Sequence, residues 1–163
     1  MQLFLIILIV GGISYVGYGL SSYYKKRYTL MSDILLFCDC LSNDIDFLHT
    51  PVKQILLNRN VQFAPELNKL LNQYKQILDN GKLLEFNQPI SSIYFKREEA
   101  EMFMSLLYEL GKSDSITQIA TIKNFKTVFT KYHIEATEEN KKYAPLALKL
   151  GVLIGILAGI LLI

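Results

Sequence analysis

The sequence predicts an all-α protein, in which a compact bundle of five to six helices lies between an N-terminal and a C-terminal transmembrane helix. Three observations lead to this fold class. The chain has 163 residues, 51% of them apolar, and the apolar excess lies at its two ends. Between the ends, apolar residues recur at spacings of three and four, the period of an amphipathic helix. No stretch shows the polar–apolar alternation of a half-buried strand.

The N-terminal segment, residues 1–24, is expected to form the first transmembrane helix. No charged residue precedes Lys25, and about 20 apolar residues suffice to span a bilayer. A cleaved signal peptide is the alternative interpretation. It is disfavoured because the apolar run is long, no basic residue precedes it, and no small-x-small cleavage pattern follows it.

The middle segment, residues 25–143, is expected to form the bundle. Its first helix carries a single apolar stripe, made of Leu30, Ile34, Phe37, Leu41, Ile45 and Leu48. Thr50 and Pro51 predict the start of a second helix, because threonine is a good N-cap and proline suits the first helical turn. The buried face of this second helix would be Val52, Ile55 and Leu56.

Three more helices follow in the predicted bundle. One begins at Pro65, ends at Asn80–Gly81, and buries Leu67, Leu70, Leu71, Tyr74, Ile77 and Leu78. After a loop over residues 82–94, helix resumes near Lys96 and buries Ala100, Phe103, Met104, Leu107 and Leu110. Gly111 is a candidate C-cap of that helix, and Ser113 or Asp114 can cap the next one. The last helix carries Ile122, Phe125, Phe129, Tyr132 and Ala136, and we expect it to run to about Tyr143.

The C-terminal segment, residues 144–163, is expected to form the second transmembrane helix, with Pro145 breaking or bending the chain at its start. A tail that lies only partly in the membrane is the alternative. Small residues recur every four positions along this segment, at Ala147, Gly151, Gly155 and Gly159. Such a face lets two membrane helices approach closely. The partner helix could belong to the first span, to a second copy of the chain in a homo-oligomer, or to another membrane protein.

The basic residues near both spans predict the orientation of the chain. Lys25, Lys26 and Arg27 follow the first span, and Lys141, Lys142 and Lys149 precede or enter the second. Positive residues flanking a span favour the cytoplasmic side. We therefore expect the bundle in the cytoplasm and both termini on the opposite side of the membrane.

The residues that carry catalytic or metal chemistry are few. His49 and His133 lie far apart in the sequence. Cys38 and Cys40 would point about 200° apart on a helix, so these two cysteines could not bind one metal ion. We therefore expect no catalytic residues, no metal and no cofactor. A net charge of +2 is too small to indicate nucleic-acid binding.

Three stretches of the chain, in order, resemble one known family. His49–Thr50–Pro51–Val52 follows the acidic residues Asp44 and Asp46. Leu110–Gly111–Lys112–Ser113–Asp114 forms a turn, with Gln118 four residues later. Lys141–Lys142–Tyr143 leads into Leu150–Gly151–Val152–Leu153–Ile154–Gly155. Together with the N-terminal span, these stretches make the whole chain similar to the stage III sporulation protein AB family, although Val52, Lys53 and Gln54 depart from its usual pattern.

That resemblance implies a function. The family is similar to the cytoplasmic helical domain of the platform protein of type II secretion and type IV pilus systems. It implies a non-enzymatic scaffold in the outer forespore membrane, on the mother-cell side, within the channel complex between mother cell and forespore. The implied partners are a secretion-type ATPase and other membrane proteins of the complex. Thr50, Pro51, Gly111, Asp114 and Gln118 would either maintain the fold or bind a partner.

Two other classes of function remain open from the residues. A membrane-anchored adaptor could serve another assembly of the type II secretion or pilus kind, or could bind a different cytoplasmic protein. An enzyme acting on membrane substrates would need an acid, base, metal or nucleophile constellation, and the sequence shows none.

Overall fold

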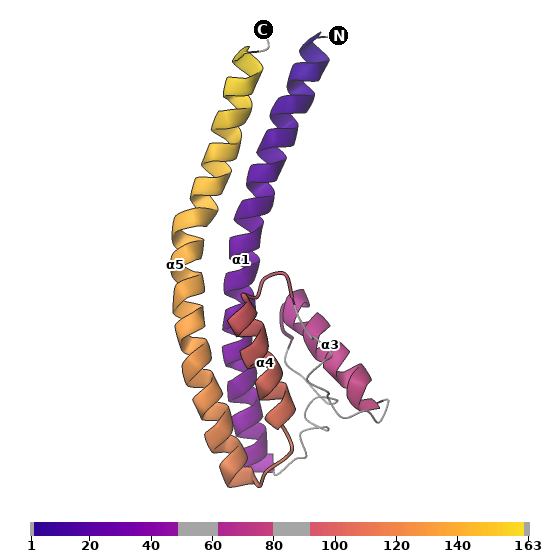
Figure 1. Cartoon of the computed structure of the whole chain (residues 1–163), viewed down its shortest axis with the longest axis vertical. Coiled ribbons are helices and arrows are strands. Elements are labelled where there is room, and N and C mark those ends of the chain that lie inside the picture. Colours follow the sequence, from indigo (N-terminus) through magenta and orange to yellow (C-terminus); the bar gives the residue numbers. More distant parts are fainter. Residues whose placement is uncertain (1, 49–61, 80–91, 162–163) are drawn as a thin grey trace. The chain divides into compact units, whose positions relative to one another are not determined.

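The computed structural model describes residues 2–48, 62–79 and 92–161, and these residues form four helices (Figure 1). They are α1 (Gln2–Leu48), α3 (Pro65–Asp79), α4 (Arg97–Glu109) and α5 (Ser115–Leu161). No strand occurs in these three ranges, so the all-α fold class is confirmed for them. The helix expected to begin at Thr50 and Pro51 lies outside the described residues, and the expected total of five to six helices stays a prediction.

The chain divides into two compact units. Unit 1 consists of Met1–Tyr28 and Glu135–Ile163, and unit 2 consists of Thr29–Ile134. Each of the long helices α1 and α5 contributes residues to both units. α1 and α5 each continue across the position where an apolar end of the chain meets the polar middle, and the division into segments 1–24, 25–143 and 144–163 stays a prediction.

The core of unit 2 is built from the apolar faces that the spacing predicts. The buried residues of α1 are Leu30, Met31, Ile34, Phe37, Cys38, Leu41 and Ile45. Those of α3 are Leu67, Leu70, Leu71 and Tyr74, and those of α4 and the following turn include Phe103, Met104, Leu106, Leu107 and Leu110. α5 adds Ile122 and Phe129. Each fully buried aliphatic or aromatic side chain stabilises the unit by about 1.5–3 kcal/mol.

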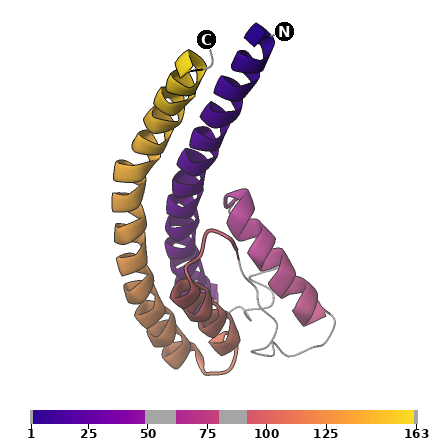
Figure 2. The same ribbon diagram turned by 45° about the horizontal axis from the view of Figure 1, so that its top comes forward.

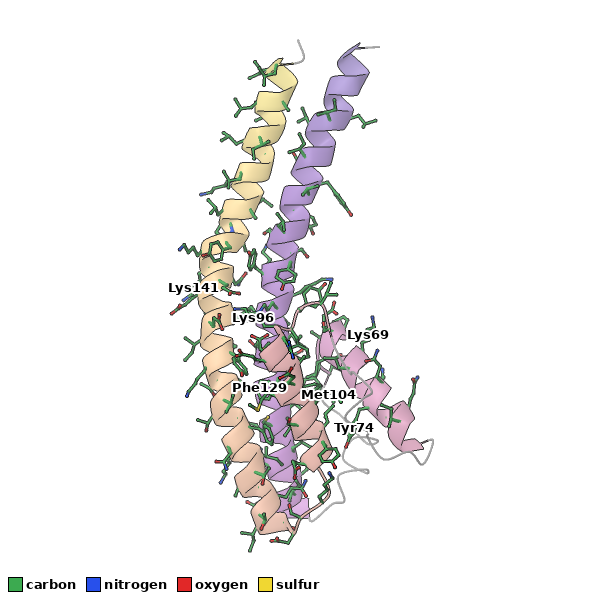
Figure 3. All side chains as sticks on the ribbon, in the orientation of Figure 1. Lys69, Tyr74, Lys96, Met104, Phe129 and Lys141 are labelled. Carbon is green, nitrogen blue, oxygen red and sulfur yellow. The ribbon has the colours of Figure 1, made fainter. Side chains whose placement is uncertain are left out.

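Aromatic side chains link α4 to α5 within this core. The ring of Phe103 on α4 lies 5.5 Å from that of Phe95 and 6.4 Å from that of Phe129 on α5. Phe129 in turn packs edge-on against Tyr132, at 5.9 Å. Edge-to-face contacts of this kind favour one arrangement of the rings over others. Figure 3 shows Phe129 among the side chains between α5 and its neighbours.

Side-chain hydrogen bonds fix α3 within unit 2. The carboxylate of Asp33 on α1 accepts a bond from the backbone N–H of Ala64, just before α3 begins, at 2.6 Å. The hydroxyl of Tyr74 on α3 donates to the carbonyl of Leu107 near the end of α4, at 2.9 Å. The last carbonyls of a helix have no partner within it, so this bond satisfies a group that burial would otherwise penalise.

In unit 1, α1 and α5 run side by side and antiparallel, with the two ends of the chain at the same end of the pair, as both ribbon views show (Figures 1 and 2). Pro145 does not break the chain, because α5 continues through it to Leu161; the alternative, that it bends the helix, stays a prediction. Proline removes one hydrogen bond of the helix. α5 contacts α1 on both sides of the proline, since Tyr143 lies against Tyr24 before it and Gly151 lies against Gly17 after it.

Among the described residues, one helix is long and apolar enough to cross a membrane, and this is α5. The apolar stretch at its C-terminal end keeps most side chains exposed, among them Leu153, Ile154, Ile156, Leu157 and Ile160. In water such a surface would be unfavourable, and a lipid surrounding removes that cost. α5 therefore indicates association with a membrane.

Candidate functional site

α1 and α5 of unit 1 approach each other closely at Gly17 and Gly151. A Cβ atom placed on Gly17 would lie 2.7 Å from the Cα atom of Gly151 and 2.8 Å from the carbonyl oxygen of Ala147. A Cβ atom on Gly155 would lie 3.1 Å from the carbonyl oxygen of Val10. Real Cβ atoms essentially never come within 3.0 Å of backbone atoms. The two backbones are therefore in contact where side chains would normally separate them.

The small-residue face of α5 is thus directed at α1 within one chain. Gly151, Gly155 and Gly159 are buried, and Ala147 is half-buried. Gly17 was missed by the sequence reasoning, which looked for a small face only in the second span. A signal was present, because Ser14, Gly17 and Ser21 recur at spacings of three and four on α1.

One buried ion pair joins the same two helices. Arg27 of α1 is 1% exposed and its guanidinium pairs with the carboxylate of Glu139 on α5. Asn140, next to Glu139, has a buried side-chain oxygen with no hydrogen-bond partner among the described residues. Removing one member of a buried ion pair leaves the other charge buried without a partner, which is strongly destabilising. The pair therefore specifies the register of α1 against α5, as the glycine contact does.

The turn between α4 and α5 holds three of the residues marked by the family resemblance. Gly111 adopts φ = 82°, a left-handed conformation that glycine accepts without steric penalty. The carboxylate of Asp114 accepts a hydrogen bond from the N–H of Thr117 at 3.3 Å, in the first turn of α5. The hydrogen bond from the side chain of Thr117, together with this backbone bond, lowers the pKa of Asp114. Both residues therefore shape the corner between the helices, and both are exposed to solvent.

Gln118, the third residue of this corner, is 5% exposed. Its side chain is long enough to reach across the turn. Its amide nitrogen has no hydrogen-bond partner among the described residues. Its backbone N–H bonds to the carbonyl of Asp114 at 2.9 Å, so its position is set by the helix. The other two residues marked by the resemblance, Thr50 and Pro51, lie outside the described residues.

The acidic residues at the start of α4 differ in burial, since Glu98 and Glu101 are exposed and Glu99 is not. Glu99 is buried, and its carboxylate accepts a hydrogen bond from the backbone N–H of Lys96 at 2.8 Å. This is half of the capping-box arrangement, in which the third residue of a helix satisfies a backbone group at its start. Arg97 and Glu101 are exposed and form an ion pair at 2.9 Å, which contributes little to stability.

A cavity of about 330 Å³ in unit 2 lies beside α3. Its lining residues are Glu66, Lys69, Leu70, Ser92, Ile93 and Tyr94. The described residues include no group of three or more histidine, cysteine and acidic side chains that could hold a metal ion. Burial raises the pKa of the Cys38 thiol to about 12, so this cysteine is a protonated core residue at neutral pH.

The comparisons with known proteins bear on the whole chain. The family model for stage III sporulation protein AB matches residues 2–163. The chain belongs to the stage III sporulation protein AB family. The resemblance found in the sequence is thereby confirmed, and membership of this family gives the chain a role connected with sporulation. Searches of the curated proteins and of the solved structures found no match.

Within this stage III sporulation protein AB chain, the structure brings the sequence-predicted residues together in two separate places. Ala147, Gly151 and Gly155 lie against α1 in unit 1. Gly111, Asp114 and Gln118 lie at the α4–α5 corner in unit 2. The first group joins helices of one chain, whereas Gly111 and Asp114 also lie on an exposed surface.

Proposed function

We propose that this stage III sporulation protein AB chain is a non-enzymatic platform subunit of the channel complex between mother cell and forespore. In this proposal, unit 1 spans the outer forespore membrane through both α1 and α5, with the two chain ends on the side away from the mother-cell cytoplasm. Unit 2 then lies in the cytoplasm and binds a secretion-type ATPase. The observation that carries the proposal is the family match over residues 2–163.

The contact between α1 and α5 in unit 1 supports the proposal that both helices span the membrane. In lipid, apolar contact alone does not bring helices together, and small residues that let backbones touch are the usual means. The Gly17–Gly151 contact is of this kind. A hairpin of two spans also places both chain ends on one side, in agreement with the basic residues that flank each span.

The α4–α5 corner is the proposed contact surface for the ATPase. Ile116, in the first turn of α5, is 82% exposed, and it lies next to the exposed residues Gly111 to Ser115. An exposed apolar side chain surrounded by polar groups is a common feature of protein-binding surfaces. In the proposed mechanism, a conformational change of the ATPase shifts unit 2, and α1 and α5 transmit the shift to membrane partners.

A photo-crosslinking amino acid at position 116 tests this proposal in sporulating cells. Ile134 provides the matched control, because it is also an exposed isoleucine of α5 in unit 2. We expect position 116 to crosslink to the ATPase and position 134 not to do so. A product with a different cytoplasmic protein would instead support an adaptor function. If neither position captures the ATPase or another channel component, the platform function is refuted.

A further inference from the structure

Contacts between α1 and α5 in unit 1 define which residues lie at the same level of the helix pair. Gly17 lies against Gly151, and the rings of Tyr24 and Tyr143 are 5.5 Å apart. Seven residues forward on α1 thus correspond to eight residues backward on α5. Arg27 and Glu139 continue this antiparallel register by one more turn.

Four lysines follow from this register as one group. Lys25 and Lys26 come directly after Tyr24, and Lys141 and Lys142 come directly before Tyr143. All four are exposed, and Figure 3 shows Lys141 on the outer side of α5. The ammonium group of Lys142 lies 5.2 Å from the ring centre of Tyr143. We call these four lysines the lysine collar.

Tyrosine rings border the collar on the side of the glycine contact. Tyr23 and Tyr24 pack edge-on with ring centres 5.5 Å apart, and Tyr24 also contacts Tyr143. Tyrosines gather at the level of lipid headgroups, where the ring lies in an apolar environment and the hydroxyl stays in a polar one. The aromatic cluster therefore marks this level of the helix pair as the boundary of the membrane.

The acidic residues near the collar leave it positively charged. Glu139 is neutralised by Arg27, which removes both from the charge that the surface presents. Glu135 and Glu138 are exposed, and they precede Lys141 on α5, on the side away from Gly151. The four lysines thus outnumber the exposed carboxylates around them, and they lie nearest to the tyrosines.

From this arrangement we infer that the lysine collar and its bordering tyrosines form a binding surface for the headgroups of anionic phospholipids. The inference rests on the proposed membrane placement of unit 1. Ammonium groups at the membrane surface attract anionic lipids, and long lysine side chains reach the phosphate level from a nearby helix. Tyrosine hydroxyls at the same level can donate hydrogen bonds to phosphate oxygens. The surface selects a phosphate that bears an uncompensated negative charge over a zwitterionic headgroup.

Spin-labelled lipids test this selectivity on the full chain. The protein is reconstituted into phosphatidylcholine bilayers that contain trace spin-labelled phosphatidylglycerol or spin-labelled phosphatidylcholine. The immobilised fraction of each label gives their relative association with the protein. We expect wild type to prefer phosphatidylglycerol by at least about threefold, because each lysine near the surface favours anionic lipid. We expect the preference to fall in high salt, which shortens the range of electrostatic attraction.

Two matched variants separate the collar from total charge. One changes the collar to glutamine (Lys25→Gln, Lys26→Gln, Lys141→Gln, Lys142→Gln). The control makes four equal changes among exposed lysines of unit 2 (Lys69→Gln, Lys112→Gln, Lys123→Gln, Lys131→Gln). We expect the collar variant to lose the preference, the control to keep it, and a collar of four arginines to restore it.

The outcomes distinguish this inference from the proposed function. A collar variant that still prefers phosphatidylglycerol, or a wild-type protein without preference, overturns the lipid-binding inference while leaving the membrane placement intact. Alkaline carbonate extraction of wild-type membranes tests that placement by itself. Release of the protein by carbonate refutes the spans, and with them the basis of the inference.

Discussion

Replacement of Gly17 by alanine tests the helix contact of unit 1 with the smallest available change. The added methyl group would lie 2.7 Å from the Cα atom of Gly151 and 2.8 Å from the carbonyl oxygen of Ala147. Both are backbone atoms, which cannot rotate away as a flexible side chain can. The helices must therefore separate. Gly19→Ala is the matched control, because a methyl group on Gly19 meets nothing within 4 Å.

The geometry sets the size of the effect. Ordinary Cβ contacts begin at 3.4 Å, so the helices must move apart by about 0.7 Å at the crossing. A gap of that order forfeits a quarter to a half of the dispersion energy of the contacts around it. Overpacking of a closely packed site typically costs about 1–3 kcal/mol, which corresponds to a roughly 5- to 150-fold increase in the equilibrium constant for helix separation. Gly19→Ala should be neutral or slightly stabilising, because alanine favours helix more than glycine does.

Nitroxide labels on the two helices measure this separation in the full chain. Leu8→Cys and Ile160→Cys place one label on each helix at exposed positions of unit 1, in a background without Cys38 and Cys40. Denaturing detergent is then titrated into protein in mild micelles, and the distance between the labels is followed. We expect Gly17→Ala to lower the midpoint of helix separation and Gly19→Ala to leave it unchanged or raise it.

Two results would refute the reasoning about this contact. If Gly17→Ala and Gly19→Ala have equal midpoints, the close approach at Gly17 does not contribute to helix pairing. If Gly17→Ala and Gly151→Ala are each harmful and their effects add fully in the double variant, the two glycines do not share one contact. A shared contact predicts that the second methyl costs less than the first, because the helices are already apart.

Three further predictions concern unit 2. Phe129→Ala should destabilise the unit by about 3–5 kcal/mol, because it empties a fully buried site between two aromatic rings; urea unfolding followed by circular dichroism measures this, and a loss below about 1 kcal/mol contradicts the packing described. Tyr74→Phe should cost about 1 kcal/mol through the bond to Leu107. Burial raises the pKa of Tyr74 to about 12 from 10.0, so the contribution of its protonated hydroxyl to the free energy of unfolding is complete below pH 10 and is lost as the pH rises towards 12. Tyr74→Phe should therefore flatten the fall in the free energy of unfolding between pH 10 and pH 12. An unchanged slope refutes the assignment of this pH dependence to Tyr74. With N-ethylmaleimide at pH 8, Cys40 should react well before Cys38, whose buried thiol has a pKa of about 12; mass spectrometry of the labelled peptides decides the order, and equal rates contradict the burial of Cys38.

Much of the fold follows from patterns that repeat along a single helix. The stripe from Leu30 to Ile45 is buried as its spacing predicts, and Pro65 begins α3. Gly111 and Asp114 mark the end of α4 and the start of α5 through their own backbone preferences. Such signals are local, because helix periodicity and capping depend on residues within four positions of one another.

Interactions between distant parts of the chain were not predictable in the same way. Arg27, which the sequence groups with Lys25 and Lys26 as a basic residue after the first span, is buried against Glu139, which is 112 positions away in the sequence. Asp33 anchors the start of α3 from α1, and nothing in its local sequence distinguishes it from an exposed carboxylate. The continuity of α5 through Pro145 likewise depends on its packing against α1.

By itself, the sequence determined that this protein is helical, which faces of its helices are apolar, and that α5 carries a small-residue face. Only the tertiary structure decided that this face meets Gly17 of the same chain and that Lys25, Lys26, Lys141 and Lys142 share one level. The physical reason is that periodicity specifies a direction around one helix axis. The register between two helices depends on close contacts and on a buried charge pair that form only when both helices are present.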